Sequence, residues 1–183
     1  MNLANKISVV RMLLIPAYLV LLMWPEGPGR QIHIVAAVVF ATASLTDALD
    51  GYVARKYNMV TNFGKFFDTL VDKLLTCSAF IALVALGRFP AWAAIIIIAR
   101  ELTISSLRAI ASQHGVVIAA DTLGKAKTII QMLGIIYLTL LPIFYFQPMV
   151  PTVTSIVVLA AVAITIVSGL DYLVKNKSLF SDA

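Results

Sequence analysis

The sequence is poor in charged residues and contains a single cysteine. Asp, Glu, Lys and Arg together make up only 13% of its 183 residues, whereas about 25% is usual in soluble domains. The lone cysteine, Cys77, excludes an intrachain disulfide and a metal centre built from cysteines. Disulfide scaffolds and zinc-ribbon folds are therefore ruled out.

Apolar residues are present in large excess. They account for 61% of the chain, against about 45–50% in soluble globular proteins. A chain of this size folded in water could not bury so many apolar side chains, which excludes a soluble globular fold. Disorder is excluded as well, because disordered segments have low hydrophobicity. The remaining class is an integral membrane protein.

The length sets the number of membrane spans. Because a transmembrane helix needs about 20 residues, the chain has room for roughly six spans and none for a separate soluble domain. We therefore predict an all-α polytopic membrane protein with one domain over residues 1–183. No small-x-small cleavage site precedes Trp24, so the first helix is expected to be retained. The six apolar stretches lie at roughly 7–24, 32–56, 63–87, 90–111, 125–146 and 151–174.

The basic residues predict the orientation of these spans. If the N-terminus is cytoplasmic, Arg30 and Arg88 alone lie on the outer side, and Arg100 falls near mid-membrane. The other basic residues then lie on or near the cytoplasmic side: Lys6, Arg11, Arg55, Lys56, Lys65, Lys73, Arg108, Lys125, Lys127, Lys175 and Lys177. This asymmetry predicts that both termini are cytoplasmic. The net charge of +5 is then explained by topology, and no nucleic-acid partner is expected.

Four of the nine acidic residues fall within one short stretch: Asp47, Asp50, Asp68 and Asp72. The first pair is spaced i, i+3 and the second i, i+4, so each pair lies on one face of a helix. The second and third spans are joined by a short turn, so we expect the two pairs to face each other. Carboxylates gathered near a bilayer need a positive partner. Oxygen ligands of this kind suit Mg²⁺ or Mn²⁺, as one ion or two.

A structural alternative exists for these acids. They could form ordinary interfacial ion pairs with Arg55, Lys56, Lys65 and Lys73. Four carboxylates at such spacings in an apolar chain favour the metal site, because ionisable groups within membranes are usually functional. Gly51, Ala54 and Gly64 lie beside the acids, where small residues would leave space for a ligand.

The spacing of these residues resembles the signature of the CDP-alcohol phosphatidyltransferase family, D-x2-D-G-x2-A-R-x8-G-x3-D-x3-D. All eight specified positions are present at the expected gaps: Asp47, Asp50, Gly51, Ala54, Arg55, Gly64, Asp68 and Asp72. Family members are built of six membrane helices, so the resemblance extends over the whole chain. They displace CMP from a CDP-linked lipid or alcohol with an alcohol nucleophile.

The resemblance implies a role for each of these residues. Asp47, Asp50, Asp68 and Asp72 would bind one or two divalent metals, and Asp72 would also be the general base for the acceptor hydroxyl. Gly51, Ala54, Arg55 and Gly64 would line the site for the donor, CDP-diacylglycerol. The site would face the cytoplasm at the cell membrane, and a homodimer is expected from the resemblance alone.

Basic residues outside the signature bear on the acceptor. Arg108, Lys125 and Lys127 could bind an anionic acceptor through charge-assisted hydrogen bonds, although anchoring of helix ends explains each equally well. The segment from Gly124 to Gln131 resembles the G-K-x-K-T-x2-Q pattern of the family branch that uses glycerol 3-phosphate. The Arg100-Glu101 pair is also similar to that branch. Glycerol 3-phosphate is therefore the expected acceptor, with inositol phosphate or another alcohol as the alternative.

A rival hypothesis comes from another class of protein. Acidic residues within membranes also mark ion or proton transporters. Such a transporter would have acids near mid-membrane, broken helices and an internal repeat. This sequence shows no clear repeat, and its signature acids lie toward one interface, so the enzyme is favoured.

Overall fold

The computed structural model describes residues 3–24, 31–56, 62–113, 122–144 and 148–177. Within its helices, the side chains of residues 3–8, 47–56, 62–66, 68, 112 and 113 lie outside the described part. The helices are α1 (Leu3–Leu22), α2 (Ile32–Lys56), α3 (Asn62–Ala85), α4 (Ala91–Gln113), α5 (Thr122–Phe144) and α6 (Val150–Lys175). Each predicted stretch matches one of them, with ends shifted by a few residues, which confirms the all-α fold.

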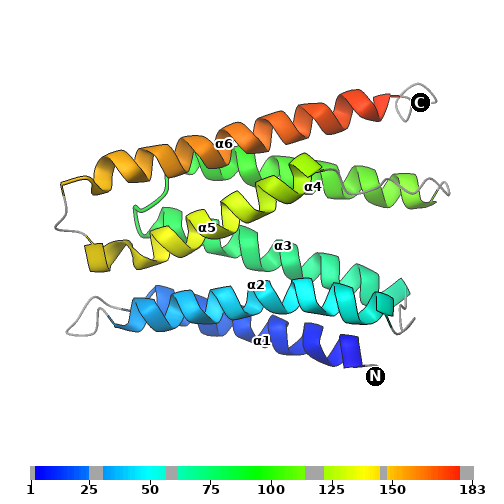
Figure 1. Cartoon of the computed structure of the whole chain (residues 1–183), viewed down its shortest axis with the longest axis horizontal. Coiled ribbons are helices and arrows are strands. Elements are labelled where there is room, and N and C mark those ends of the chain that lie inside the picture. Colours follow the sequence, from blue (N-terminus) through cyan, green and yellow to red (C-terminus); the bar gives the residue numbers. More distant parts are fainter. Residues whose placement is uncertain (1–2, 25–30, 57–61, 114–121, 145–147, 178–183) are drawn as a thin grey trace.

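The helices form an antiparallel bundle of three layers. Figure 1 shows that each helix runs opposite to the one before it, so that α1 begins and α6 ends at the same end of the molecule. In the described residues α1 packs on α2, and α4 packs on α6. Between these pairs lie α3, which contacts α1, α4 and α5, and α5, which contacts α2 and α6. The central layer therefore joins the two outer pairs.

The expected contact between the second and third helices is present, but it is small. Within the described residues, α3 has a more extensive interface with α1 than with α2. The first helix therefore helps to hold the helix that carries Asp68 and Asp72.

Glycine and proline define the helix ends near the turns. Gly87 has a φ of 67°, a left-handed conformation that costs little without a Cβ atom. The amide of Arg88 donates to the carbonyl of Leu83 over 2.9 Å, and the amide of Gly87 donates to Val84 over 3.0 Å. This pair of hydrogen bonds is the Schellman motif that terminates a helix, and it sets the start of the turn into α4. Pro151 lies in the first turn of α6, where its missing amide hydrogen costs nothing.

Apolar side chains cover the outside of the bundle and also form most of its core, in which some polar side chains are buried as well. Large apolar side chains are exposed on all six helices, including Leu13, Val38, Ile81, Ile95 and Leu159. Two described helices, α5 and α6, are long and apolar enough to cross a membrane. In each of them only 33% of the apolar window is buried within the molecule, so these are not the core helices of a soluble protein. An apolar exterior of this kind suits a lipid surrounding.

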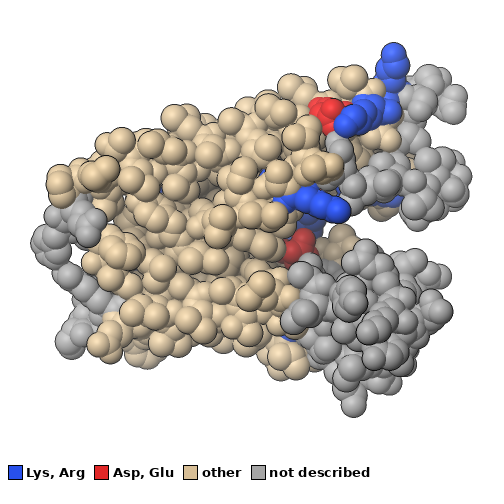
Figure 2. Space-filling model, in the orientation of Figure 1, with Lys and Arg blue, Asp and Glu red and all other residues tan. Residues whose placement is uncertain are grey.

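Ten polar or charged side chains are buried among the described residues. They are Arg11, His33, Ser44, Arg88, Glu101, Lys127, Gln131, Thr139, Thr165 and Ser168. In Figure 2 the described charged side chains gather mainly at one end of the visible face, where the surface is hollowed. The charged end is the one at which α6 finishes.

Candidate functional site

The eight signature residues lie on α2 and α3, as expected. Seven of them have side chains outside the described part: Asp47, Asp50, Gly51, Ala54, Arg55, Gly64 and Asp68. Their helical spacing is confirmed, because 47–56 and 62–68 are helical. The convergence of the four carboxylates stays a prediction. Among the described residues no group of three or more His, Cys, Asp or Glu side chains is found.

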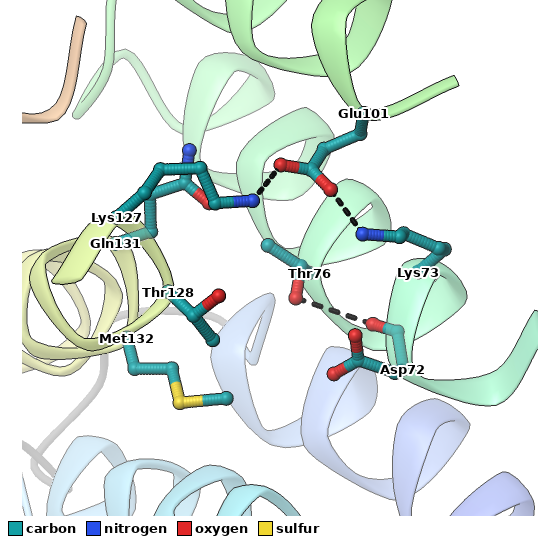
Figure 3. A pocket seen from close by; sticks show the side chains of 8 residues that line it. All are labelled: Asp72, Lys73, Thr76, Glu101, Lys127, Thr128, Gln131 and Met132. Atoms are coloured by element: carbon teal, nitrogen blue, oxygen red, sulfur yellow. Dashed lines mark hydrogen bonds and ion pairs between the residues drawn. The ribbon is translucent and has the colours of Figure 1, made fainter. Parts of the chain in front are cut away.

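Asp72 is the signature residue whose surroundings are described. It is half-buried on α3 and lines a pocket between α3, α4 and α5. One turn later, the hydroxyl of Thr76 donates to the backbone carbonyl of Asp72 over 3.2 Å, and this leaves the carboxylate oxygens to other partners. The pocket is lined by Asp72, Lys73, Thr76, Glu101, Lys127, Thr128, Gln131 and Met132, as Figure 3 shows.

A buried carboxylate forms the wall of this pocket opposite Asp72. Glu101 on α4 is only 1% exposed. Its Oε2 accepts a hydrogen bond from Lys73 of α3, and its Oε1 accepts one from Lys127 of α5. In Figure 3 the two ammonium groups approach the carboxylate from opposite sides. One carboxylate thus links three helices by charge-assisted bonds, which are stronger than neutral ones.

Arg100 adds a third cation to this group. Its Nη1 lies 3.5 Å from Oε1 of Glu101, and its Nη2 donates to the hydroxyl of Ser168 on α6 over 3.2 Å. We call Lys73, Arg100, Glu101 and Lys127 the ion cluster. A Cβ atom at Gly169 would lie 3.2 Å from Cγ of Arg100, so the glycine makes room for the arginine beside α6.

The three residues expected to bind the acceptor's phosphate have different surroundings. Lys127 is buried, 4% exposed, and lines the pocket. Lys125 is exposed and lies outside the pocket lining. Arg108 is exposed at its place on α4, with its guanidinium 5.4 Å from the centre of the Tyr172 ring on α6, within the range of a cation–π contact. The structure therefore brings only Lys127 of the three into the pocket with Asp72.

Two residues of the pocket were not assigned a site role from sequence. Lys73 was considered only as an interfacial partner of the aspartates, and Glu101 only as part of a similar dipeptide. The structure pairs them with each other. One signal was available, since an acidic residue in the middle of an apolar stretch needs a buried cation. The sequence did not show which cation would meet it, because Lys73 lies 28 residues away on another helix.

The sequence of this chain is similar to those of known proteins. The family model described as CDP-alcohol phosphatidyltransferase matches residues 1–167. A protein of Bacillus subtilis (strain 168) named CDP-diacylglycerol–glycerol-3-phosphate 3-phosphatidyltransferase is 41% identical over 186 residues, covering 96% of this chain and 95% of its own length.

Two further relatives agree with that match. A probable phosphatidylglycerophosphate synthase of Mycobacterium tuberculosis (strain ATCC 25618 / H37Rv) is 37% identical, over 95% of this chain and 81% of its own length. A protein of Rickettsia typhi (strain ATCC VR-144 / Wilmington), with the same name as the Bacillus protein, is 34% identical over 98% and 99% of the two chains. The similarity therefore includes all elements that form the pocket.

Proposed function

We infer the activity from a single premise: this chain belongs to the CDP-alcohol phosphatidyltransferase family. We propose that it transfers the phosphatidyl group of CDP-diacylglycerol to glycerol 3-phosphate, giving phosphatidylglycerophosphate and CMP. The names of relatives that match nearly the full chain support this donor and this acceptor. The observation that carries the proposal is that Asp72, the last acid of the signature, shares one pocket with the buried cation Lys127.

The reaction assigns a proton transfer to Asp72. A hydroxyl oxygen of glycerol 3-phosphate forms a bond to the phosphorus that bears diacylglycerol. The bond from that phosphorus to the bridging oxygen breaks, and CMP leaves with the electron pair. The carboxylate of Asp72 takes the proton of the attacking hydroxyl, as a general base within hydrogen-bond reach. Its place on the pocket wall supports this role.

We propose that Asp47, Asp50, Asp68 and Asp72 hold one or two divalent cations. The donor set consists of carboxylate oxygens, which suits Mg²⁺ or Mn²⁺. The helical spacing of each pair on α2 and α3 supports a shared face. When bound, the metal would offset the charge of the pyrophosphate and stabilise the leaving CMP.

The substrates would be divided between two groups of residues. Gly51, Ala54, Arg55 and Gly64 would line the site of CDP-diacylglycerol, as the signature implies. Arg108, Lys125 and Lys127 would bind the phosphate of the acceptor. The burial of Lys127 beside Asp72 supports its part in this group, because a buried ammonium attracts an anion more strongly than an exposed one.

We further propose that all six helices span the cell membrane, with both termini and the active site facing the cytoplasm. Exposed apolar side chains on every helix support the six spans. The antiparallel order, in which α1 begins and α6 ends at one end of the bundle, supports a common side for the termini. A homodimer is proposed from the family resemblance.

The proposed function is tested with purified protein in detergent micelles that contain CDP-diacylglycerol. Release of CMP is measured with glycerol 3-phosphate, with inositol phosphate and without acceptor, each before and after removal of divalent metal. We expect release only with metal and glycerol 3-phosphate. A better rate with inositol phosphate would refute the choice of acceptor. Metal-dependent uptake into vesicles without CMP release would support the transporter instead.

A further inference from the structure

The ion cluster contains more positive than negative charge. Lys73, Arg100 and Lys127 each carry one positive charge, and Glu101 supplies one negative charge. Lys127 is 5% exposed at its side chain and Arg100 is 15% exposed, so water reaches these cations poorly. Asp72 on the facing wall of the pocket can offset one of the two surplus charges, and an anion that enters the pocket would offset the other.

The pocket lies where such an anion could bind. It is bordered by Lys73, Glu101 and Lys127 on one side and by Asp72 and Thr128 on the other. An ammonium group has three N–H donors, and the bond to Glu101 uses one donor of each lysine. The remaining donors of both lysines can serve the oxygens of a phosphate that enters between them.

Stability alone is a weak explanation for this arrangement. A buried ion pair is frequently no more stabilising than apolar residues of similar volume. The long flexible lysine side chains also lose rotamer freedom when they are fixed. Glu101 fixes two of them, from α3 and from α5, on the wall of the pocket that Asp72 also lines.

We propose that Glu101 is a positioning residue for the acceptor, and that it holds Lys73 and Lys127 as a pair that binds the phosphate of glycerol 3-phosphate. This inference rests on the proposed function and adds Glu101 and Lys73 to the acceptor site. Each carboxylate oxygen of Glu101 accepts a hydrogen bond from one of the lysines. The lysines therefore offset the negative charge of Glu101 where it faces the pocket. The bound phosphate then places the acceptor hydroxyl toward Asp72.

The experiment measures KM for each substrate in Glu101→Gln and Lys73→Gln. Both variants should raise KM for glycerol 3-phosphate by about tenfold or more, which corresponds to one charge-assisted hydrogen bond. KM for CDP-diacylglycerol should change by less than about twofold. Equilibrium dialysis with labelled glycerol 3-phosphate should show the same loss of binding in the absence of turnover.

Lys73→Gln and two added variants, Glu101→Asp and Asp171→Asn, keep the test decisive. Lys73→Gln removes one surplus cation and should fold even if Glu101→Gln does not. Glu101→Asp keeps the charge but is one methylene shorter, so it should fold and still raise KM for the acceptor. Asp171→Asn is the matched control, since Asp171 on α6 pairs with Lys175 at 2.7 Å away from the pocket lining. This control should leave both KM values unchanged.

The outcomes separate the two proposals. Failure of the wild-type protein to release CMP with glycerol 3-phosphate would refute the proposed function. If the wild-type protein is active, an unchanged KM for the acceptor in Lys73→Gln and Glu101→Asp would refute only the proposed role of Glu101. The same conclusion would follow if both KM values rose equally, because that is the result expected of a general structural defect.

Discussion

Gln131 of α5 donates a hydrogen bond from Nε2 to the hydroxyl of Thr165 on α6, over 2.9 Å. Both side chains are buried, at 2% and 0% exposure. The hydroxyl of Thr165 in turn donates to the carbonyl of Ala161. The hydroxyl therefore accepts one hydrogen bond and donates another. Gln131 lies one turn after Lys127 and also lines the pocket. The bond therefore fixes the helix that presents Lys127 against its outer neighbour.

Replacement of this hydroxyl should loosen α5 against α6. Thr165→Val keeps the shape of the side chain but removes the acceptor for Gln131. We expect the free energy of unfolding to fall by about 0.6–2 kcal/mol, the range for hydrogen bonds between membrane helices. Chemical unfolding in mild detergent would measure it. Ser155→Ala on the same helix is the control, because its exposed hydroxyl bonds only to the carbonyl of Pro151 in the described structure. Equal stability of the two variants would contradict the prediction.

Asp72→Asn should abolish turnover, because an amide cannot accept the proton of the acceptor hydroxyl at neutral pH. Binding of CDP-diacylglycerol should be largely retained, since the proposed donor site consists mainly of other signature residues. CMP release and binding of a labelled donor lipid would be measured on the same preparation. Asp171→Asn serves again as an isosteric control with expected normal turnover. Substantial activity of Asp72→Asn would remove the general-base assignment.

The two lysines of the segment 124–131 should differ in effect. Lys127→Gln removes the buried ammonium of the pocket, and KM for glycerol 3-phosphate should rise by about tenfold or more. Lys125→Gln removes an exposed ammonium outside the pocket lining. Water screens the attraction of this group for the acceptor's phosphate, so the effect should stay below about threefold. Initial rates at varied acceptor concentration would decide. A larger effect of Lys125→Gln would move the phosphate toward the exposed end of α5.

The topology makes a separate prediction. A fluorescent reporter that folds only in the cytoplasm should be active when fused after residue 183. Alkaline phosphatase, which is active only outside the cytoplasm, should be inactive at the same position. The reverse pattern would overturn the orientation that the distribution of Lys and Arg predicts.

Most of the fold could be predicted from sequence because the apolar stretches and the breaks between them determine the helices. Apolar stretches of about 20 residues separated by Gly and Pro predict the helices and their approximate ends. The pairing of helices was harder to predict. The short turn before Asn62 indicated that α2 and α3 are neighbours, yet α1 is the larger partner of α3 in the described residues. Contacts between helices distant in sequence depend on side-chain shape, which hydropathy does not report.

The residues that line the pocket could be predicted in part, and their roles stay predictions. The signature identified Asp72, which lies in the pocket, and the basic residues of α5 included Lys127. Glu101 and Lys73 were missed as site residues because a charge pattern along one helix does not show its partner on another. Arg11 illustrates the same difficulty. It was counted among the residues that orient the chain, and the structure buries it completely.

The ion cluster also has a consequence for how the protein is made. A lone charge at the centre of a membrane helix costs about 2.5–3.5 kcal/mol during insertion. In the proposed topology the helices would enter the membrane in chain order, so Lys73 on α3 would arrive before Glu101 on α4 and Lys127 on α5. A chain interrupted after α3 would lack Glu101, the carboxylate that pairs with Lys73 in the complete bundle. In that topology the cluster would couple the stable insertion of the early helices to the synthesis of the later ones.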